Sequence, residues 1–289
     1  MRKSIALIVL LLSVFSNAYL ENKLTFEVND YVFEVLSDEE VRVVLYYGDE
    51  SNVVIPEEIG KYRVVSIGDY AFSPYENNLD GLTNIQNVYI PASITDMGKN
   101  PFMECYKLEN IIVDSENSHF TVIDQSLICR DDLTLITCFS NNQQYIIPDS
   151  IHTIGVDSFY CGDFETITIP SNTKTILDYA FWGCSLTTVN MNQGIQQIGE
   201  SAFEGCSNLE HVYIPDGVLS IGAHAFAQCD SLIDIRISGS VSEIGEDIIS
   251  IYPWFNGYEL NTYTTVLITK GSFAEKYCIE NNLNMKYIE

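Results

Sequence analysis

A short motif recurs along the chain every 22 or 23 residues, and this period constrains the fold more than any other feature. The clearest copy begins at Leu209, reads Leu-x-x-Val-x-Ile-Pro, continues through Ile-Gly and Ala-Phe, and ends at Cys229. Further copies run from Phe164 to Cys184, from Leu186 to Cys206 and from Leu232 to Gly245, with looser ones around Ile55, Ile90 and Ile147. Several residue types at fixed offsets in so many copies indicate a repeat protein.

Each copy has the pattern of one small structural unit. Leu209, Val212 and Ile214 alternate as the inward side chains of a short strand do, and the proline that follows ends that strand. Gly222 is expected to permit a tight turn at positive φ, and Ala225-Phe226 to lie on one helical turn. Because one such unit is too small to offset the backbone entropy lost on folding, neighbouring units must stack and share a core.

This consensus resembles the BspA-type leucine-rich repeat, found in surface and secreted proteins of mucosal bacteria and parasitic protists. The resemblance covers nearly the whole chain after residue 18. It implies a right-handed leucine-rich-repeat solenoid: a stack of short parallel β-strands with short helical turns, β-rich caps and one β-hairpin insertion. Tyr31 to Leu36, Phe120 to Ile136 and Lys270 to Tyr277 resemble the entry strands, the insertion and the terminal segment of that family. Its members are linked mainly to adhesion and host-protein binding, and its motif contains no catalytic residue.

Four regions are expected along the chain. Arg2 and Lys3 followed by an apolar run and a small-residue site ending at Ala18 predict a signal peptide at residues 1–18, too short to span a bilayer. Residues 19–50 are expected to form an N-terminal β cap, residues 51–250 the repeats with a hairpin insertion at about 114–144, and residues 251–289 a C-terminal cap. Ser272, with Glu275 three residues later, predicts the start of a short helix in that cap.

The charge balance limits the possible partners. The chain has 40 acidic and 14 basic residues, a formal net charge of −26, and would repel nucleic acid and anionic lipid. The four histidines, His119, His152, His211 and His224, are scattered over different copies without a catalytic or metal-binding spacing. We therefore expect a protein ligand, no nucleic acid, no membrane insertion, no cofactor, no metal and no enzymatic activity.

Eight cysteines allow two interpretations. Cys105, Cys161, Cys184, Cys206 and Cys229 share one position in the repeat. Equivalent positions in stacked coils point the same way, which favours a column of small buried thiols. Export makes disulfides possible as well, and Cys129 and Cys138, on either side of the turn in the insertion, are the best candidates for one.

Outward-facing residues of the repeated strands form the candidate binding surface. In each strand of the pattern Leu-x-x-Val-x-Ile, the residue before Val and the residue between Val and Ile face away from the core. Stacking of the strands places these residues on one continuous sheet face. They are Asn87, Tyr89, Asn110, Ile112, Gln144, Ile146, Thr166, Thr168, Thr188, Asn190, His211, Tyr213, Asp234 and Arg236. This set is polar, aromatic and almost uncharged, although Thr and Tyr are also common on a solvated sheet face that binds nothing.

Two functions remain open at this point. The first is a secreted or surface-associated protein that mediates protein–protein interaction, and specifically adhesion to host or extracellular-matrix proteins. The second is a structural protein that assembles with copies of itself into a coat at the cell surface.

Overall fold

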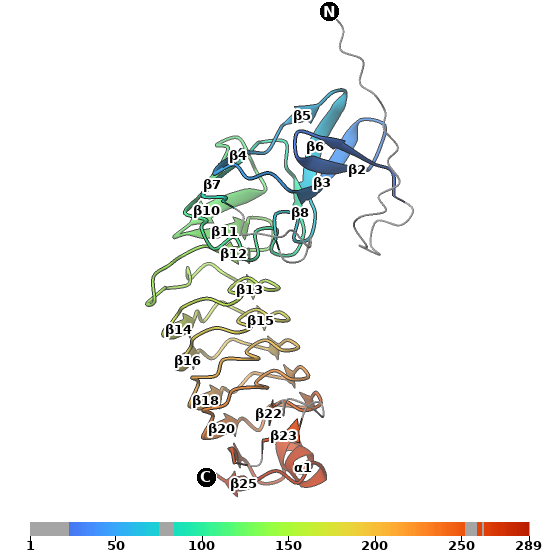
Figure 1. The fold of residues 1–289 in the computed structure, drawn as a ribbon. Coiled ribbons are helices and arrows are strands. Elements are labelled where there is room, and N and C mark those ends of the chain that lie inside the picture. The colour runs from blue at the N-terminus through green and yellow to red at the C-terminus, as the bar shows by residue number, and fades with distance from the viewer. Residues whose placement is uncertain (1–22, 75–83, 252–258, 262, 289) are drawn as a thin grey trace, which may run out of the picture. The chain divides into compact units, whose positions relative to one another are not determined.

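The described residues form two compact units. The computed structural model describes residues 23–74, 84–251, 259–261 and 263–288, and the chain divides between Val122 and Ile123 (Figure 1). This division falls within the segment where a hairpin insertion is expected. The expected signal peptide, residues 1–18, lies outside the described residues. We refer to the two units as the N-terminal and the C-terminal unit.

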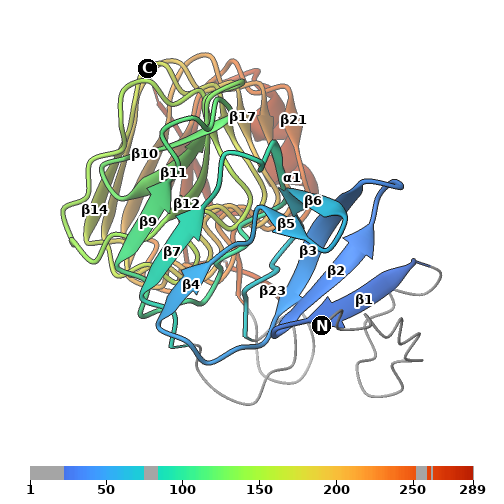
Figure 2. The same ribbon diagram turned by 90° about the horizontal axis from the view of Figure 1, so that it is seen from above.

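Two sheets make up the N-terminal unit. The first has the order β1-β2-β3-β6-β5, with β8 also pairing β6, and the second has the order β4-β7-β9. Their strands are β1 (Thr25–Val28), β2 (Tyr31–Val35), β3 (Glu40–Tyr46), β4 (Asn52–Val54), β5 (Glu58–Ile59), β6 (Tyr62–Ile67), β7 (Asn87–Ile90), β8 (Asp96–Met97) and β9 (Asn110–Val113), and β10 (Phe120–Ile123) spans the division between the units. Strands β1 to β3 are antiparallel, whereas β4, β7 and β9 are parallel and lie side by side in Figure 2. The parallel pairing begins with β3, the last strand of the expected cap, which pairs in parallel with β6.

Aromatic side chains pack on the buried side of the first sheet. Tyr31 on β2 lies with its ring centroid 4.7 Å from that of Tyr46 on β3, and Tyr46 lies 5.4 Å from Phe72. All three side chains are buried. Phe72 in turn stacks on Phe102 of the next coil at 5.0 Å. The antiparallel strands therefore pack against the first repeat of their own unit through rings, which bury the most apolar area per side chain.

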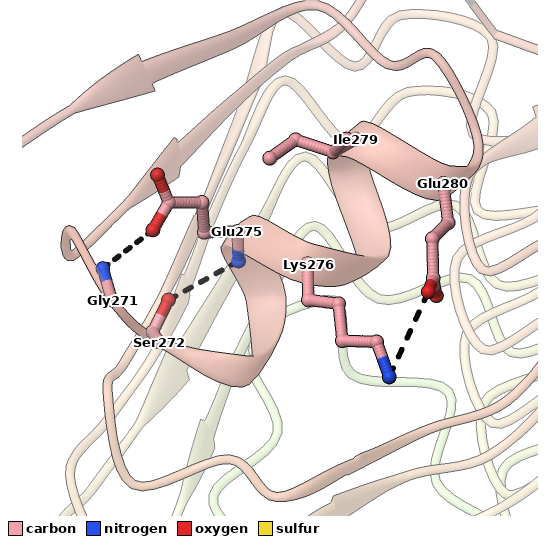
Figure 3. Close-up of a pocket in the computed structure, with 6 residues that line it drawn as sticks. All are labelled: Gly271, Ser272, Glu275, Lys276, Ile279 and Glu280. Atoms are coloured by element: carbon pink, nitrogen blue, oxygen red, sulfur yellow. Dashed lines mark hydrogen bonds and ion pairs between the residues drawn. The ribbon is translucent and has the colours of Figure 1, made fainter.

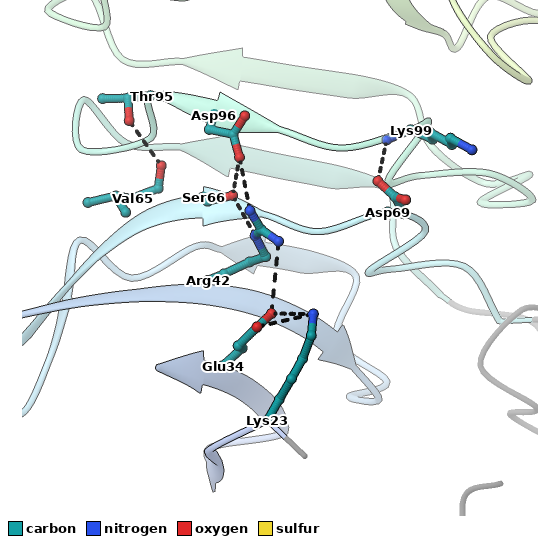
Figure 4. Close-up of polar contacts among 9 residues, drawn as sticks. All are labelled: Lys23, Glu34, Arg42, Val65, Ser66, Asp69, Thr95, Asp96 and Lys99. Atoms are coloured by element: carbon teal, nitrogen blue, oxygen red, sulfur yellow. Dashed lines mark hydrogen bonds and ion pairs between the residues drawn. The ribbon is translucent and has the colours of Figure 1, made fainter. Parts of the chain in front are cut away.

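A chain of polar contacts joins the strands of this sheet (Figure 4). Glu34 on β2 lies 3.1 Å from the ammonium of Lys23 and 3.9 Å from the guanidinium of Arg42 on β3. Arg42 Nε donates to Ser66 Oγ on β6 at 3.0 Å, and Ser66 Oγ donates to Asp96 Oδ2 on β8 at 2.7 Å. Side chains from four strands thus satisfy one another, which couples the antiparallel cap to the first parallel strands.

Parallel strands stack regularly in the C-terminal unit. Its strands are β11 (Ser126–Cys129), β12 (Thr134–Cys138), β13 (Thr153–Ile154), β14 (Thr166–Ile169), β15 (Thr175–Ile176), β16 (Thr188–Met191), β17 (Gln197–Ile198), β18 (His211–Ile214), β19 (Ser220–Ile221), β20 (Asp234–Ile237), β21 (Glu243–Ile244), β22 (Ser250–Ile251), β23 (Glu259–Leu260), β24 (Thr265–Ile268) and β25 (Met285–Tyr287). One sheet runs β14-β16-β18-β20-β24-β25 and another β12-β13-β15-β17-β19-β21. The coils from β14 to β21 each contribute a four-residue strand to one sheet and a two-residue strand to the other. This arrangement is a leucine-rich-repeat solenoid, as predicted (Figure 1).

A column of phenylalanine rings runs through the core of this unit. Phe159, Phe181, Phe203 and Phe226 occupy the same place in successive coils and are fully buried. Neighbouring ring centroids lie 4.8, 4.9 and 5.2 Å apart, close to the roughly 4.8 Å spacing of strands in a sheet. The buried strand residues between them, such as Ile167 and Val212, complete one continuous core.

The prediction of a helical turn in each repeat is wrong. In the described part of the repeats, hydrogen-bonded turns take the place of the helical turns. Backbone N–H groups that a helix would use within its own coil donate instead to the next coil. Phe181 N donates to Ala202 O at 2.8 Å, and Phe203 N donates to Ala225 O at 2.8 Å. Moreover, Ser201 has φ of 51°, a left-handed conformation that a right-handed helix cannot continue through. The two-residue strands beside these turns were not expected from the sequence.

The expectation for Gly222 is also wrong. This glycine is absent from the positive-φ residues, and the left-handed residue is His224, two positions later, with φ of 56°. Gly222 is required for a different reason: a Cβ added to it would lie 2.4 Å from Glu200 N and 2.5 Å from Gly199 C of the preceding coil. The repeated glycine therefore permits close approach of neighbouring coils.

The cysteines are free thiols throughout. Cys184 and its counterparts Cys206 and Cys229 are buried, and each Sγ donates to a phenylalanine carbonyl of the preceding coil at 3.0 to 3.3 Å. Burial raises the pKa of these thiols well above the usual range. Cys105 in the N-terminal unit is buried in the same way and donates to Phe72 O at 3.4 Å.

One cysteine expectation needs correction, and one open alternative is decided. Cys161 is exposed rather than buried, because it takes the place that Gly183 has in the next coil and shares its left-handed backbone, with φ of 51° against 66°. Cys129 and Cys138 are not paired. In the β11–β12 hairpin Cys129 lies opposite Thr134 and Cys138 opposite Ser126, so about three residues, or roughly 10 Å along the strand, separate the two thiols.

The C-terminal cap ends in a short helix. Helix α1 spans Phe273–Glu280, and Ser272 is its N-cap, accepting from Glu275 N at 3.2 Å, as the sequence predicts. Ala274, Tyr277 and Cys278 bury the inner face of the helix against the last coil. Strand β25 then adds a parallel strand to β24, which the sequence did not indicate.

Candidate functional site

The candidate surface of the C-terminal unit is the outward side of its four-residue strands, which we call the strand face. Buried and outward residues alternate in every one of these strands. On β14 the outward residues are Thr166 and Thr168, on β16 Thr188 and Asn190, on β18 His211 and Tyr213, and on β20 Asp234 and Arg236. Parallel pairing keeps these residues in register from strand to strand. Of the residues that the sequence predicts for this face in the C-terminal unit, all lie together on its strands except Gln144 and Ile146.

Gln144 and Ile146 were expected on this face, but they lie on no strand. The side chain of Asn142 accepts a hydrogen bond from Gln144 N at 3.1 Å, which is a local turn that uses the donor a strand would need. Ile146 is 77% exposed. Tyr145 and Ile147 are buried, so Gln144 and Ile146 face away from the core as expected, and only the strand is missing from this segment.

Side-chain contacts concentrate at the C-terminal end of the strand face. His211 Nδ1 donates to Asp234 Oδ2 at 3.0 Å across neighbouring strands. The guanidinium of Arg236 lies over the ring of Tyr213, 5.1 Å from its centroid, a cation–π contact. Tyr213 nevertheless remains 43% exposed. This cluster presents an aromatic face, guanidinium donors and an imidazole to solvent, the side-chain types in which binding energy is commonly concentrated.

The strand face extends further than the sequence indicated. Thr265 and Leu267 on β24 pair in register with Asp234 and Arg236, and Lys286 on β25 pairs with Leu267. The alternation of Val266 and Ile268 could have identified the outward residues of β24. Nothing comparable marks Lys286, because the segment around it does not follow the repeat.

In the N-terminal unit the outward residues of β4, β7 and β9 form a second small face. Asn87 and Asn110, both expected here, form an amide ladder with Asn52: Asn110 Nδ2 donates to Asn87 Oδ1, and Asn87 Nδ2 to Asn52 Oδ1, each at 2.8 Å. Asn52 was not singled out from the sequence, although it has the same repeat offset as the other two. A hydrogen-bonded amide ladder fixes the register of the three strands.

An apolar column lies beside this ladder. Val54 and Ile112 are 63% and 57% exposed, and Tyr89, paired in register with both, is partly exposed. Tyr89 OH donates to Asp114 Oδ2. This hydrogen bond raises the pKa of Tyr89. The same bond, together with one from Glu116 N, lowers the pKa of the Asp114 carboxyl. Tyr89 is therefore held by a neighbour, whereas Val54 and Ile112 are open to solvent.

A shallow hollow beside α1 is the other surface feature (Figure 3). It is lined by Gly271, Ser272, Glu275, Lys276, Ile279 and Glu280. The polar groups that line the hollow interact with one another: Gly271 N donates to Glu275 Oε2 at 2.5 Å, and Lys276 lies 3.7 Å from Glu280. These contacts cap and stabilise the helix, so the hollow has the character of a helix terminus rather than of a ligand site.

Within the described ranges, no group of three or more His, Cys, Asp or Glu side chains is placed to hold a metal ion. None of the helical structure in the same ranges has the length and apolarity that crossing a lipid bilayer requires.

Comparison with protein families gives one match. A model described as the BspA type leucine rich repeat region matches six copies, over residues 51–146 and 137–251. These ranges include the strands that carry both faces, from β4 to β20. No curated protein sequence matches the chain.

Several solved structures also match the chain. The pneumococcal vaccine antigen PcpA has a TM-score of 0.53 and 12% identity, over 92% of this chain and 99% of that one. A leucine-rich cell surface protein from Faecalibacterium prausnitzii has a TM-score of 0.48 and 18% identity, over 77% and 94% of the two chains. A leucine-rich repeat protein from Eubacterium ventriosum has a TM-score of 0.45 and 14% identity, over 81% and 98%. At these identities the similarity concerns the fold alone.

Proposed function

Because the chain belongs to the BspA-type leucine-rich repeat family, we propose that it is an exported binding protein that attaches to host or extracellular-matrix proteins through the strand face. Proteins of this fold present side chains from stacked strands on one extended surface, which suits recognition of another protein rather than enclosure of a small molecule.

The cluster of His211, Tyr213 and Arg236 is the observation that carries this proposal. Asp234 on the neighbouring strand holds His211, and Tyr213 and Arg236 contact each other, so less rotamer freedom remains to be lost when a partner binds. The face around them is solvated and nearly uncharged in a chain of net charge −26. A protein that only needed solubility would be expected to distribute its carboxylates over this face as well.

Export is the second part of the proposal. Its support is the expected signal peptide at residues 1–18. Expression with and without residues 1–18, followed by fractionation of cells and medium, tests it: the full chain should appear shortened outside the cytoplasm, and the truncated chain should remain inside.

Binding is tested with matched pairs of substitutions on the two sheets of the C-terminal unit. The variant Tyr213→Ala with Asn190→Ala removes outward side chains of the strand face. The control Gln197→Ala with Ser220→Ala removes outward side chains of the two-residue strands. Each protein is applied to surfaces coated with extracellular-matrix extract, and its melting temperature is measured in parallel.

The strand-face variant should lose at least tenfold in affinity, since large outward aromatic residues commonly contribute about 2 kcal/mol or more to an interface. The control should bind like the parent, and both should melt like the parent. Equal binding by the two variants would reject the strand face as the contact surface. Parent protein that grows into large assemblies with concentration, as measured by light scattering, would favour the self-assembling coat instead.

A further inference from the structure

We propose that the C-terminal end of the strand face binds a polypeptide segment in which a carboxylate side chain lies next to an aromatic or aliphatic one. This proposal rests on the function proposed above and identifies the chemistry of the partner at one part of the same surface.

The relevant residues form one row across four neighbouring strands. Tyr213 on β18 pairs with Arg236 on β20, Arg236 with Leu267 on β24, and Leu267 with Lys286 on β25. We call these four residues the Arg236 row. Strands in a sheet lie about 4.8 Å apart, so the two cations are separated by roughly 10 Å with the leucine between them. Apolar and cationic side chains therefore alternate along the row.

The charges in this row are unusual for the chain. Acidic residues outnumber basic ones by 40 to 14, so carboxylates are available over most of the surface. Even so, no carboxylate of the described residues forms an ion pair with Arg236 or Lys286, both of which are exposed. The neighbouring Asp234 is engaged by His211. Two cations thus remain available to a carboxylate from outside.

The contact with Tyr213 leaves the guanidinium of Arg236 able to bind a carboxylate. The guanidinium carbon of Arg236 lies over the ring of Tyr213, 5.1 Å from its centroid, and a guanidinium carries five N–H donors in a planar fork, which a contact with one ring does not use up. Arg236 can therefore donate two parallel hydrogen bonds to a carboxylate while it stays on the tyrosine ring. An aromatic or aliphatic neighbour of that carboxylate would pack on Leu267 and on the exposed part of Tyr213.

The net negative charge of the chain does not prevent this contact. At physiological ionic strength, interactions between exposed charges are screened beyond about 8 Å. A carboxylate bound at Arg236 or Lys286 therefore interacts mainly with the side chains of the row and with the adjacent Asp234, rather than with the distant carboxylates of the chain. Nucleic acid differs from such a segment, because its closely spaced phosphates would extend past the row onto acidic surface.

The experiment uses the mature chain and labelled Gly/Ser peptides with one of three cores: Glu-Phe-Glu, Lys-Phe-Lys or Gln-Phe-Gln. Affinity is measured by fluorescence anisotropy for the parent and for Arg236→Glu and Lys286→Glu. The control Lys174→Glu makes the same change in net charge at an exposed residue that precedes β15, on the other sheet.

The acidic-core peptide should bind the parent at least tenfold more tightly than the basic-core peptide. Each charge reversal in the row should weaken that binding about tenfold, because attraction at contact distance becomes repulsion, and Lys174→Glu should change it less than twofold. A basic or neutral core that binds as well as the acidic core, or an acidic core that does not bind, would overturn the proposal.

Two further results have defined meanings. If the acidic core fails while Tyr213→Ala with Asn190→Ala still reduces attachment to matrix extract, the strand face remains the binding surface and only its carboxylate preference is rejected. Dimerisation of the parent that Arg236→Glu abolishes would place a second copy of this chain on the row and would also overturn the proposal.

Discussion

The ring of Phe203 lies parallel to the ring of Phe226 in the next coil, with an interplanar angle of 3° and centroids 5.2 Å apart. Phe203 also stacks on Phe181 at 4.9 Å, so it has a partner on both faces. Replacing it with alanine should lower the free energy of unfolding by about 3–5 kcal/mol, through lost burial and the cavity left between two coils. Urea denaturation followed by circular dichroism measures this loss.

The matched control is Tyr263→Ala, because this aromatic side chain is 87% exposed. Its replacement should change the unfolding free energy by less than about 0.5 kcal/mol. Similar losses for the two variants would show that the phenylalanine column does not hold the coils together.

Glycine at the repeat position should be required for packing between coils. Gly222→Ala should destabilise the protein by about 1–3 kcal/mol, since its Cβ would collide with the backbone of Gly199 and Glu200. Gly239→Ala is the control: its nearest neighbour would be Thr269 Oγ1 at 3.7 Å, an ordinary contact, so the change should be neutral or slightly stabilising. Thermal unfolding of both variants separates the two cases. If Gly222→Ala melts like the parent, the coils are not as closely spaced as the structure has them.

The buried thiols predict a loss of stability in alkali. Burial raises the pKa of Cys138 and of Cys278 to about 11, from 9.0 for an ordinary thiol. The folded chain therefore keeps thiol protons that the unfolded chain releases, so their contribution is complete below about pH 9 and is lost as the pH rises toward 11. Cys278→Ala lacks one of these groups.

Urea unfolding under reducing conditions at several pH values between 8 and 11 tests this prediction. The unfolding free energy of the parent should fall across the range, and that of Cys278→Ala should fall less steeply. Comparing slopes cancels the constant cost of the cavity that alanine leaves. Parallel slopes would mean that Cys278 titrates alike in the folded and unfolded chains.

The repeated strands and their inward residues were predictable, because each depends on a period that a single sequence displays. Leu209, Val212 and Ile214 are buried in the structure, and Thr188, His211 and Asp234 lie in register on the opposite side. Strand alternation is a local property, so the side on which each residue lies follows from its position in the motif.

Features that depend on the neighbouring coil were not predictable in the same way. Ala225-Phe226 has the composition of a helical turn, yet Phe226 N donates to Ile248 O of the next coil at 2.9 Å. Gly222 was assigned to a turn because its real constraint, the backbone of the preceding coil, is invisible in one copy. Lys286 lies on the strand face through pairing of a strand that does not follow the repeat.

The hydrogen bond from Tyr89 to Asp114 gives a direct test of the face in the N-terminal unit. It is the largest cause that lowers the pKa of the Asp114 carboxyl, ahead of the bond from Glu116 N. A depressed carboxyl pKa contributes stability above the ordinary value of 3.8, which is lost as the pH falls through the folded pKa. Tyr89→Phe should therefore raise the pKa of Asp114 toward 3.8, as measured by carbon-13 NMR titration of its carboxyl.

Tyr213→Phe is the control for this titration, because Tyr213 lies on β18 of the C-terminal unit with Arg236 over its ring, and it should leave the Asp114 pKa as in the parent. An unchanged Asp114 pKa in Tyr89→Phe would mean that the hydroxyl does not donate to this carboxylate in solution. Tyr89 would then be free to turn outward beside Val54 and Ile112, and the apolar column would offer a ligand a larger contact than the hydrogen-bonded tyrosine allows.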